Sequence, residues 1–158
     1  MSPIDAADEG YLERAVVLAW EARERGDHPF GALLVTADGM VLEARNSVLT
    51  EADPTGHAET NLVRLAGRLD LATLTGSSLY TSTEPCAMCA GAIYWSGIGR
   101  VVFALSGEAL AAMVPDESGI PPLRLTSGEV FARGGRPVTL DGPADLASAT
   151  DVHRDFWT

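Results

Sequence analysis

The chain has 158 residues, 46% of them hydrophobic, and its 22 acidic and 11 basic residues give a formal net charge of −11. This length and composition favour a single globular domain over residues 1–158 and exclude a disordered chain. The basic residues are all arginines scattered along the sequence, whereas proteins that grip nucleic acid usually carry basic clusters. A nucleic-acid substrate is therefore not expected.

The sequence also bears on the compartment. No apolar run approaches the ~20 residues that a membrane span needs, and residues 1–10 are acidic and lack the apolar stretch of a signal peptide. We therefore expect a cytoplasmic protein with no membrane partner. The only cysteines, Cys86 and Cys89, are three residues apart, which in such a chain points to metal or redox chemistry more than to a structural disulfide.

The first third of the chain is predicted to form a helix followed by a hairpin. Apolar residues at helical spacing predict a helix over residues 6–25. Residues 30–36 and 41–45 are strand-like, and the Asp38-Gly39 pair between them is a hairpin turn signal. A polar loop, residues 46–56, follows.

The rest of the chain is predicted to alternate helices and strands. The predicted helices cover residues 57–69, 85–96, 126–132 and 144–156, and the predicted strands cover residues 78–82, 100–105 and 137–140. Pro85 suits the first turn of its helix, and Thr126 or Ser127 suits the cap of a later one. The pattern predicts a sheet covered by helices and partly antiparallel at one edge.

Two short segments carry residues suited to chemistry, Thr55–Glu59 and Glu84–Cys89. His57, Cys86 and Cys89 are good zinc ligands, and cysteines at i and i+3 can hold one metal from a single helix face. Three ligands leave a position for water, as in catalytic zinc sites, and zinc lowers the pKa of that water toward neutrality. The alternative for the cysteines is a redox pair or two small buried residues.

Glu59, two residues after His57, is the candidate proton carrier. Replacing a ring amino group by oxygen needs one proton on the ring nitrogen and one on the departing ammonia, and a single carboxylate can move both. Side chains at i and i+2 point apart within a helix, so both reach one pocket only if the metal lies beyond the helix end. The order H-x-E…P-C-x-x-C is the signature of zinc-dependent nucleobase deaminases.

With these motifs the chain resembles the cytidine deaminase-like superfamily over most of its first 105 residues. Within it, the chain is similar to the branch of guanine deaminases, tRNA adenosine deaminases and fungal-type cytosine deaminases. The similarity extends to Asn46 and to residues 28–32, 53–55 and 90–95. The resemblance implies a three-layer α/β/α sandwich around a five-stranded mixed sheet, one zinc ion per chain and usually a homodimer.

The resemblance also implies roles for single residues near the two motifs. The three predicted ligands would hold zinc, and Glu59 would shuttle protons. Phe30 would pack on the ring of the base, Asn46 would hydrogen-bond it, and the backbone around Ala58 would polarise it. For Asn46 the rival interpretation is a loop residue that bonds its own backbone.

The remaining implied substrate contacts are less local. Trp95 would stack on the base, and Asp116 or Glu117 would read the amino group of a purine. Residues 144–158 would form a lid over the site of the same chain or of a neighbour, through Asp155, Phe156 and Trp157. His153 is expected to be exposed near the C-terminus.

The favoured function is hydrolytic deamination of a free nucleobase, with release of ammonia. Guanine is the first candidate, because the Tyr94-Trp95 pair resembles guanine deaminases, whereas the tRNA enzymes tend to have His at the second position. Cytosine, isocytosine and a triazine stay open. The alternatives are a tRNA adenosine deaminase, which would need a basic groove, and a non-catalytic deaminase-fold subunit, against which an intact Glu59 argues.

Overall fold

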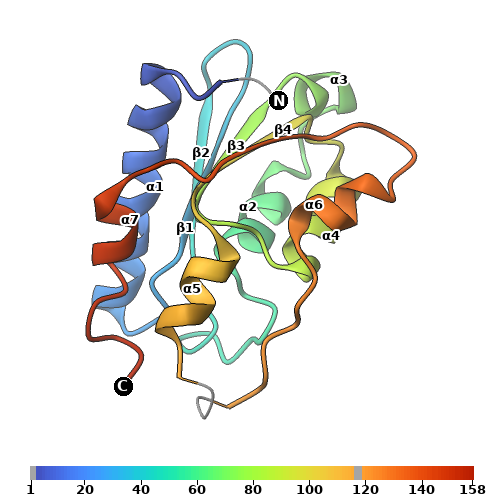
Figure 1. Cartoon of the computed structure of the whole chain (residues 1–158). Coiled ribbons are helices and arrows are strands. Elements are labelled where there is room, and N and C mark those ends of the chain that lie inside the picture. The colour runs from blue at the N-terminus through green and yellow to red at the C-terminus, as the bar shows by residue number, and fades with distance from the viewer. Residues whose placement is uncertain (1–2, 116–118) are drawn as a thin grey trace.

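The computed structural model describes residues 3–115 and 119–158, which form an α/β fold (Figure 1). Its strands are β1 (Gly31–Val35), β2 (Val41–Arg45), β3 (Ser78–Thr83), β4 (Arg100–Leu105) and β5 (Thr139–Asp141). Its helices are α1 (Ala6–Arg25), α2 (Ala58–Ala66), α3 (Leu71–Thr75), α4 (Ala87–Ser96), α5 (Gly107–Met113), α6 (Ser127–Ala132) and α7 (Ala147–Asp151). None of the described helices combines the length and apolar composition needed to cross a bilayer.

The strands form one mixed sheet in the order β2-β1-β3-β4-β5. Strand β1 runs antiparallel to both β2 and β3, with Ala32 opposite Thr81 in the second pair. Strands β3, β4 and β5 pair in parallel, with Thr81 opposite Phe103. The predicted five-stranded mixed sheet with an antiparallel edge is thus confirmed.

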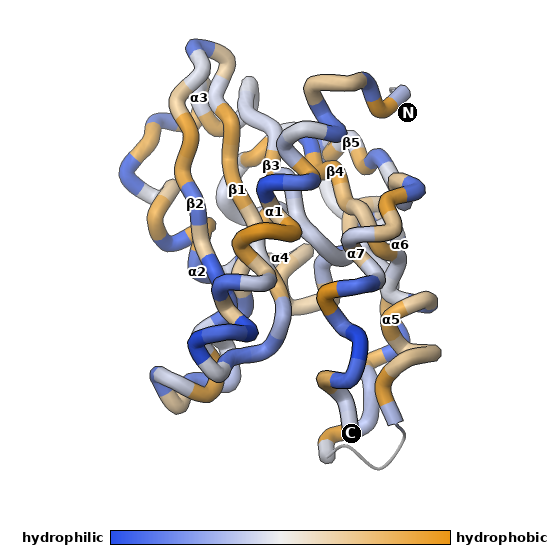
Figure 2. Tube along the Cα trace, turned by 90° about the vertical axis from the view of Figure 1, so that its left-hand side faces the viewer, coloured by the Kyte–Doolittle hydropathy of each residue, from blue (hydrophilic) through white to orange (hydrophobic). Residues whose placement is uncertain are grey.

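Helices cover both faces of the sheet and so make three layers (Figure 1). Helices α1 and α7 pack on one face, and α2, α4 and α6 pack on the other. Ala32 and Leu34 belong to the core under α2 and α4, whereas Leu33 belongs to the core under α1. Successive side chains of a strand point to opposite faces, so β1 serves both cores. Figure 2 shows β1 and β4 as largely hydrophobic and the edge strand β2 as mixed.

Gly31 allows α1 to lie directly on the sheet. A Cβ atom at this position would lie 2.4 Å from the Ala15 carbonyl oxygen and 2.5 Å from the Leu18 Cβ atom. Only a residue without a side chain fits that approach. The close packing fixes the start of β1, next to Phe30.

A buried ionic network joins α1 to the middle of the sheet. Asp8 accepts two hydrogen bonds from the Arg100 guanidinium, at 2.8 and 2.9 Å, and one from the Tyr80 hydroxyl at 2.7 Å. Arg100 also donates to Asp141 at 2.9 Å. The Arg100 side chain holds the pKa of Asp8 down at about 2. The network therefore ties together one helix and three strands.

Most predicted elements appear close to the expected bounds. The exceptions are two short helices that are not predicted and one predicted helix that is too long. Helices α3 and α5 have five and seven residues and are not predicted from the sequence. Elements of this length carry no clear periodicity, although Asp70 and Ser106 cap them through their side chains. The helix predicted over 144–156 is wrong in length, because α7 ends at Asp151 and the chain then turns.

Candidate metal and active site

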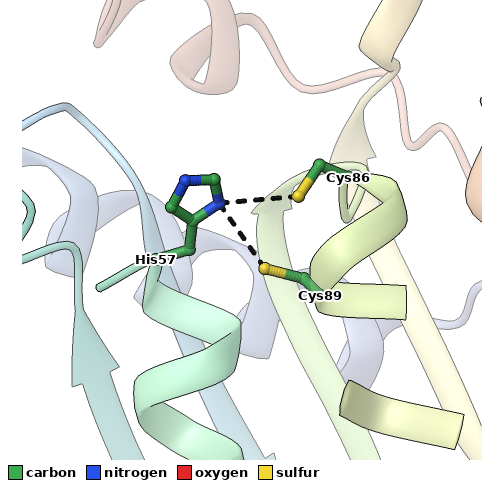
Figure 3. A group of neighbouring side chains, drawn as sticks. All are labelled: His57, Cys86 and Cys89. Carbon is green, nitrogen blue, oxygen red and sulfur yellow. Dashed lines mark hydrogen bonds between the residues drawn. The ribbon is translucent and has the colours of Figure 1, made fainter. Parts of the chain in front are cut away.

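Two helix N-termini bring three potential ligands together (Figure 3). His57 is the N-cap residue of α2 and Cys86 is that of α4, while Cys89 lies in the first turn of α4. The Nδ1 atom of His57 lies 3.5 Å from Cys86 Sγ and 3.6 Å from Cys89 Sγ. All three ligand atoms lie within 4.8 Å of one another.

These separations fit one zinc ion. Zinc binds imidazole nitrogen at about 2.0–2.1 Å and thiolate sulfur at about 2.3 Å, so a tetrahedral site separates nitrogen from sulfur by roughly 3.5 Å. The two nitrogen–sulfur distances, 3.5 and 3.6 Å, agree with that value. Within the described residues this is the one such cluster of His, Cys, Asp or Glu. Zinc bound there lowers the pKa of a coordinated water and supplies a nucleophile near neutral pH.

Contacts among the three side chains also set their charges. Hydrogen bonds with the Cys89 thiol and the His57 ring lower the pKa of Cys86, which favours the thiolate form of its sulfur. The contact with Cys86, together with burial, raises the pKa of Cys89. Binding a cation therefore releases a proton from Cys89. The Thr60 hydroxyl, 3.2 Å from Cys89 Sγ, is placed to donate to the resulting thiolate.

Glu59 is almost fully buried beside the ligands. It is the second residue of α2, it is 5% exposed, and its Oε1 atom accepts a hydrogen bond from the Thr81 hydroxyl at 2.8 Å. Burial raises the pKa of Glu59, which brings the carboxylate toward the range useful for proton transfer near neutrality. Sequence reasoning misses Thr81, because a threonine within a buried strand carries no motif.

Three residues expected to contact substrate come from the segments around β1 and α2. Phe30 is half-buried immediately before β1. Asn46 is 1% exposed, and its Oδ1 atom accepts a hydrogen bond from the Val48 backbone N–H at 3.1 Å. This hydrogen bond is the one that the rival interpretation of Asn46, as a loop residue that bonds its own backbone, requires. The bond uses the side-chain oxygen of Asn46 and leaves its amide nitrogen out of the turn. Ala58 is buried in the first turn of α2, where backbone N–H groups have no partner within the helix.

The C-terminal segment packs on His28 and Phe30, which come just before β1. The ring centroids of Phe156 and Trp157 lie 6.1 and 5.5 Å from that of His28, and burial lowers the pKa of His28. Asp155 is exposed, with a left-handed backbone of φ 59°. His153 is 2% exposed, so the expectation of an exposed residue is wrong.

Arg23 of α1 fastens this segment, and sequence reasoning gave it no role. Its guanidinium donates to the carbonyl oxygens of Val152 and Arg154 at 2.8 and 2.7 Å. The same group lies 5.4 Å from the Phe156 ring centroid and 5.3 Å from that of Trp20. Helical spacing alone places Arg23 on a charged surface, and its long-range partners come from the tertiary fold.

Other predicted residues lie apart from the ligands. Trp95, in the last turn of α4, is 85% exposed, and its ring lies edge-on to that of Tyr94 at 5.5 Å. It lines a cavity of about 540 Å³ together with residues of α2, α3 and their connection. Within the described part of the chain Trp95 is therefore not brought to the ligand cluster. Asp116 and Glu117 lie outside the described residues.

Glu84 is a further residue that sequence reasoning left without a role. Its carboxylate accepts hydrogen bonds from the Gly107 backbone N–H and from the Ser127 hydroxyl, both at 2.9 Å. These contacts tie the segment before Cys86 to the first residues of α5 and α6. A buried serine at the start of a helix is a weak sequence signal, because the partner lies 43 residues away.

Comparison with known proteins agrees with this geometry. Residues 5–105 match the family of the cytidine and deoxycytidylate deaminase zinc-binding region. The chain is 40% identical over 152 residues to a probable cytosine deaminase of Schizosaccharomyces pombe, covering 95% of this chain and 92% of the relative. It is 42% identical over 112 residues to guanine deaminase of Bacillus subtilis, covering 70% and 72% of the two chains.

The fold agrees with solved structures as well. A guanine deaminase from Nitrosomonas europaea superposes with a TM-score of 0.74 at 28% identity, covering 96% of this chain and 85% of that one. Family match and ligand geometry lead to the same assignment. The chain belongs to the cytidine and deoxycytidylate deaminase family and is a zinc-dependent deaminase.

Proposed function

We propose that this protein hydrolytically deaminates a free nucleobase, with guanine as the first candidate. The observation that carries the proposal is a buried carboxylate, Glu59, beside a three-ligand zinc site. Guanine is supported by the similarity to guanine deaminases and by the Tyr94-Trp95 pair. Cytosine is the second candidate, because the similarity to a probable cytosine deaminase extends over 95% of the chain.

Glu59 is the residue that moves protons in this proposal. The reaction joins water to the amino-bearing carbon and releases ammonia, so the base exchanges an amino group for an oxygen. Glu59 accepts a proton from water, delivers it to the neighbouring ring nitrogen, and then passes the second proton to the departing amine. The Thr81 hydroxyl holds the carboxylate in place for both transfers.

Other residues of the chain bind the base. Phe30 packs on the ring, the free amide nitrogen of Asn46 donates to it, and the N–H groups at Ala58 polarise its carbonyl oxygen. Residues 144–158 act as a lid of the single domain, and the half-buried rings of Phe156 and Trp157 support a position over the site of their own chain. Asp155 of this lid, together with Asp116 or Glu117 before α6, is our candidate for reading exocyclic groups.

The rival functions conflict with specific observations. A tRNA substrate would require a basic groove, whereas the chain has a net charge of −11 and no lysine. A non-catalytic subunit would have no use for a carboxylate that is buried at an energetic cost beside the ligands. A small-molecule substrate agrees with both observations.

We also infer a homodimer in the cytoplasm. Trp95 and Leu71 line the same cavity and are 85% and 66% exposed, which is unusual for large apolar side chains. A second copy packed on this surface would cover both residues and give Trp95 a place near a substrate site. Light scattering at micromolar concentration should give twice the mass of one chain.

The cytoplasm is the compartment we propose, because its reducing conditions keep available the reduced thiols that zinc needs.

The test of the function is ammonia release by the zinc-loaded protein. The panel contains guanine, cytosine, isocytosine, adenine, 5-azacytosine, ammeline and several nucleosides. Turnover of a free base establishes the reaction class and ranks guanine against cytosine in the same experiment. Zinc-loaded protein that turns over none of these bases would refute the proposal.

A further inference from the structure

His153, just after α7, is a buried histidine enclosed by aromatic rings. It is 2% exposed, and its ring centroid lies 5.4 Å from that of Phe30. The Trp157 ring lies nearly parallel to it, with centroids 6.1 Å apart and an interplanar angle of 16°. Burial lowers the pKa of His153 to about 4, so the imidazole is neutral at physiological pH.

The hydrogen bond with Trp157 determines which nitrogen of His153 carries the proton. The indole Nε1–H of Trp157 can only donate, and it lies 3.2 Å from Nδ1 of His153. Nδ1 therefore accepts, and in a neutral imidazole the proton must then be on Nε2. The chain thus fixes His153 as an Nε2–H donor.

This Nε2–H group is buried without a partner among the described residues. A buried donor that stays unpaired is destabilising, so such groups in native proteins call for an explanation. The position of the ring provides one. His153 contacts both Phe30 and Trp157, the two rings that the proposed function places at the substrate, and these two rings also contact each other, at 6.1 Å.

We propose that His153 is a specificity-determining residue, which donates its Nε2–H to a ring nitrogen or carbonyl oxygen of the bound base. This inference rests on the proposed function and adds a residue to it. All the candidate bases carry such acceptors on the rim of a planar ring. A donor held in one tautomer discriminates strongly, because a base without the matching acceptor leaves the buried N–H unpaired.

The test compares His153→Phe with the wild-type protein. Phenylalanine keeps an aromatic ring against Phe30 and Trp157 and removes both nitrogen atoms. We expect KM for the preferred base to rise by about 10- to 100-fold, with a smaller change in kcat and unchanged zinc content. Trp157→Phe keeps the ring but removes the donor that fixes the tautomer, so KM should rise by a smaller factor. Arg133→Gln, on an exposed residue at the end of α6 and outside the proposed lid, is the control and should leave KM unchanged.

Substrate analogues separate recognition from a structural role. We would compare guanine with 7-deazaguanine and 9-deazaguanine, or cytosine with 4-aminopyrimidine, each of which lacks one acceptor. The wild-type protein should discriminate against at least one analogue, and His153→Phe should lose that discrimination. If the variant folds, binds zinc and keeps both the KM and the discrimination of the wild type, the inference is overturned while the proposed function stands.

A second measurement covers the case in which His153→Phe does not fold. In wild-type protein labelled with ¹⁵N-histidine, the Nε2–H resonance of His153 should shift and become protected from exchange when a base is bound. An unchanged resonance at saturating base would overturn the inference. If the wild-type protein releases ammonia from none of the bases, the proposed function itself fails and His153 fails with it.

Discussion

Replacing Glu59 by glutamine separates proton transfer from metal binding. Glutamine has nearly the same shape as glutamate, and its carbonyl oxygen can accept the hydrogen bond that Thr81 now donates to Glu59 Oε1 at 2.8 Å. Glu59 is also not a member of the three-ligand cluster. The variant should therefore fold and bind zinc as the wild type does.

The expected loss of activity is large, because Glu59 is the proposed carrier of both protons. General acid–base catalysis by one group contributes about 10²- to 10⁴-fold, which corresponds to roughly 3–5 kcal/mol of activation free energy. Burial leaves little room for solvent to replace the carboxylate, since the side chain is only 5% exposed. We therefore expect kcat to fall toward the upper end of that range.

The assay follows ammonia release from the preferred base, with zinc measured in the same sample. Glu24→Gln is the matched control, because Glu24 is exposed on α1 and the variant makes the same change of charge. One zinc per chain with kcat reduced at least ~100-fold is the expected outcome. Loss of zinc would identify Glu59 as a ligand, and near-normal turnover would show that another group moves the protons; either result refutes the reasoning.

Three further predictions concern one zinc ligand and two residues that hold α1 on the sheet. Cys86→Ser removes one of three ligands and should lose most of the zinc, measured by mass spectrometry of the metal; full retention would remove Cys86 from the site. Asp8→Asn should lower the free energy of unfolding by about 2 kcal/mol at neutral pH. Because the lowered pKa stabilises the folded state above pH 3.8, denaturation curves should show the difference shrinking as pH falls from 3.8 to about 2. Gly31→Ala places a Cβ 2.4 Å from a backbone oxygen of α1 and should cost about 1–3 kcal/mol, seen as a lower Tm in calorimetry; an unchanged Tm would contradict the close packing.

The sequence predicts the fold well where periodicity and turn chemistry agree. The bounds of α1 and β2 coincide with the predicted ranges, because a long amphipathic pattern and an Asp-Gly turn are strong local signals. Short helices such as α3 are not predicted, since five residues give no periodic pattern. The conformation of the C-terminal segment is not predicted either, because it depends on hydrogen bonds from Arg23, about 130 residues earlier in the chain.

The candidate site likewise contains residues that the sequence predicts and residues that only the structure reveals. His57 and Glu59 belong to one short motif, and because side chains at i and i+2 point apart within a helix, the sequence places the metal beyond the helix end, where the structure has His57 as the N-cap residue. Thr81 and His153 carry no motif, and their partners come from other elements, so only the structure reveals them. A histidine near a chain end is usually exposed, but the rings of Phe30 and Trp157 bury this one.

The residues that the sequence predicts carry the deamination chemistry, whereas those that only the structure reveals bear on which base is bound. The zinc ligands and Glu59 lie at the starts of α2 and α4, which are packed on the central sheet within the region that matches the family, residues 5–105. The rings of the C-terminal segment that we propose as a lid come from outside that region and pack on Arg23 of α1 and on His28, Phe30 and His153. Such a segment can change in sequence without replacing a zinc ligand or Glu59, because none of these four residues belongs to it. The identity of the base should therefore depend on the lid and on residues such as His153, while the deamination itself depends on the two helix N-termini.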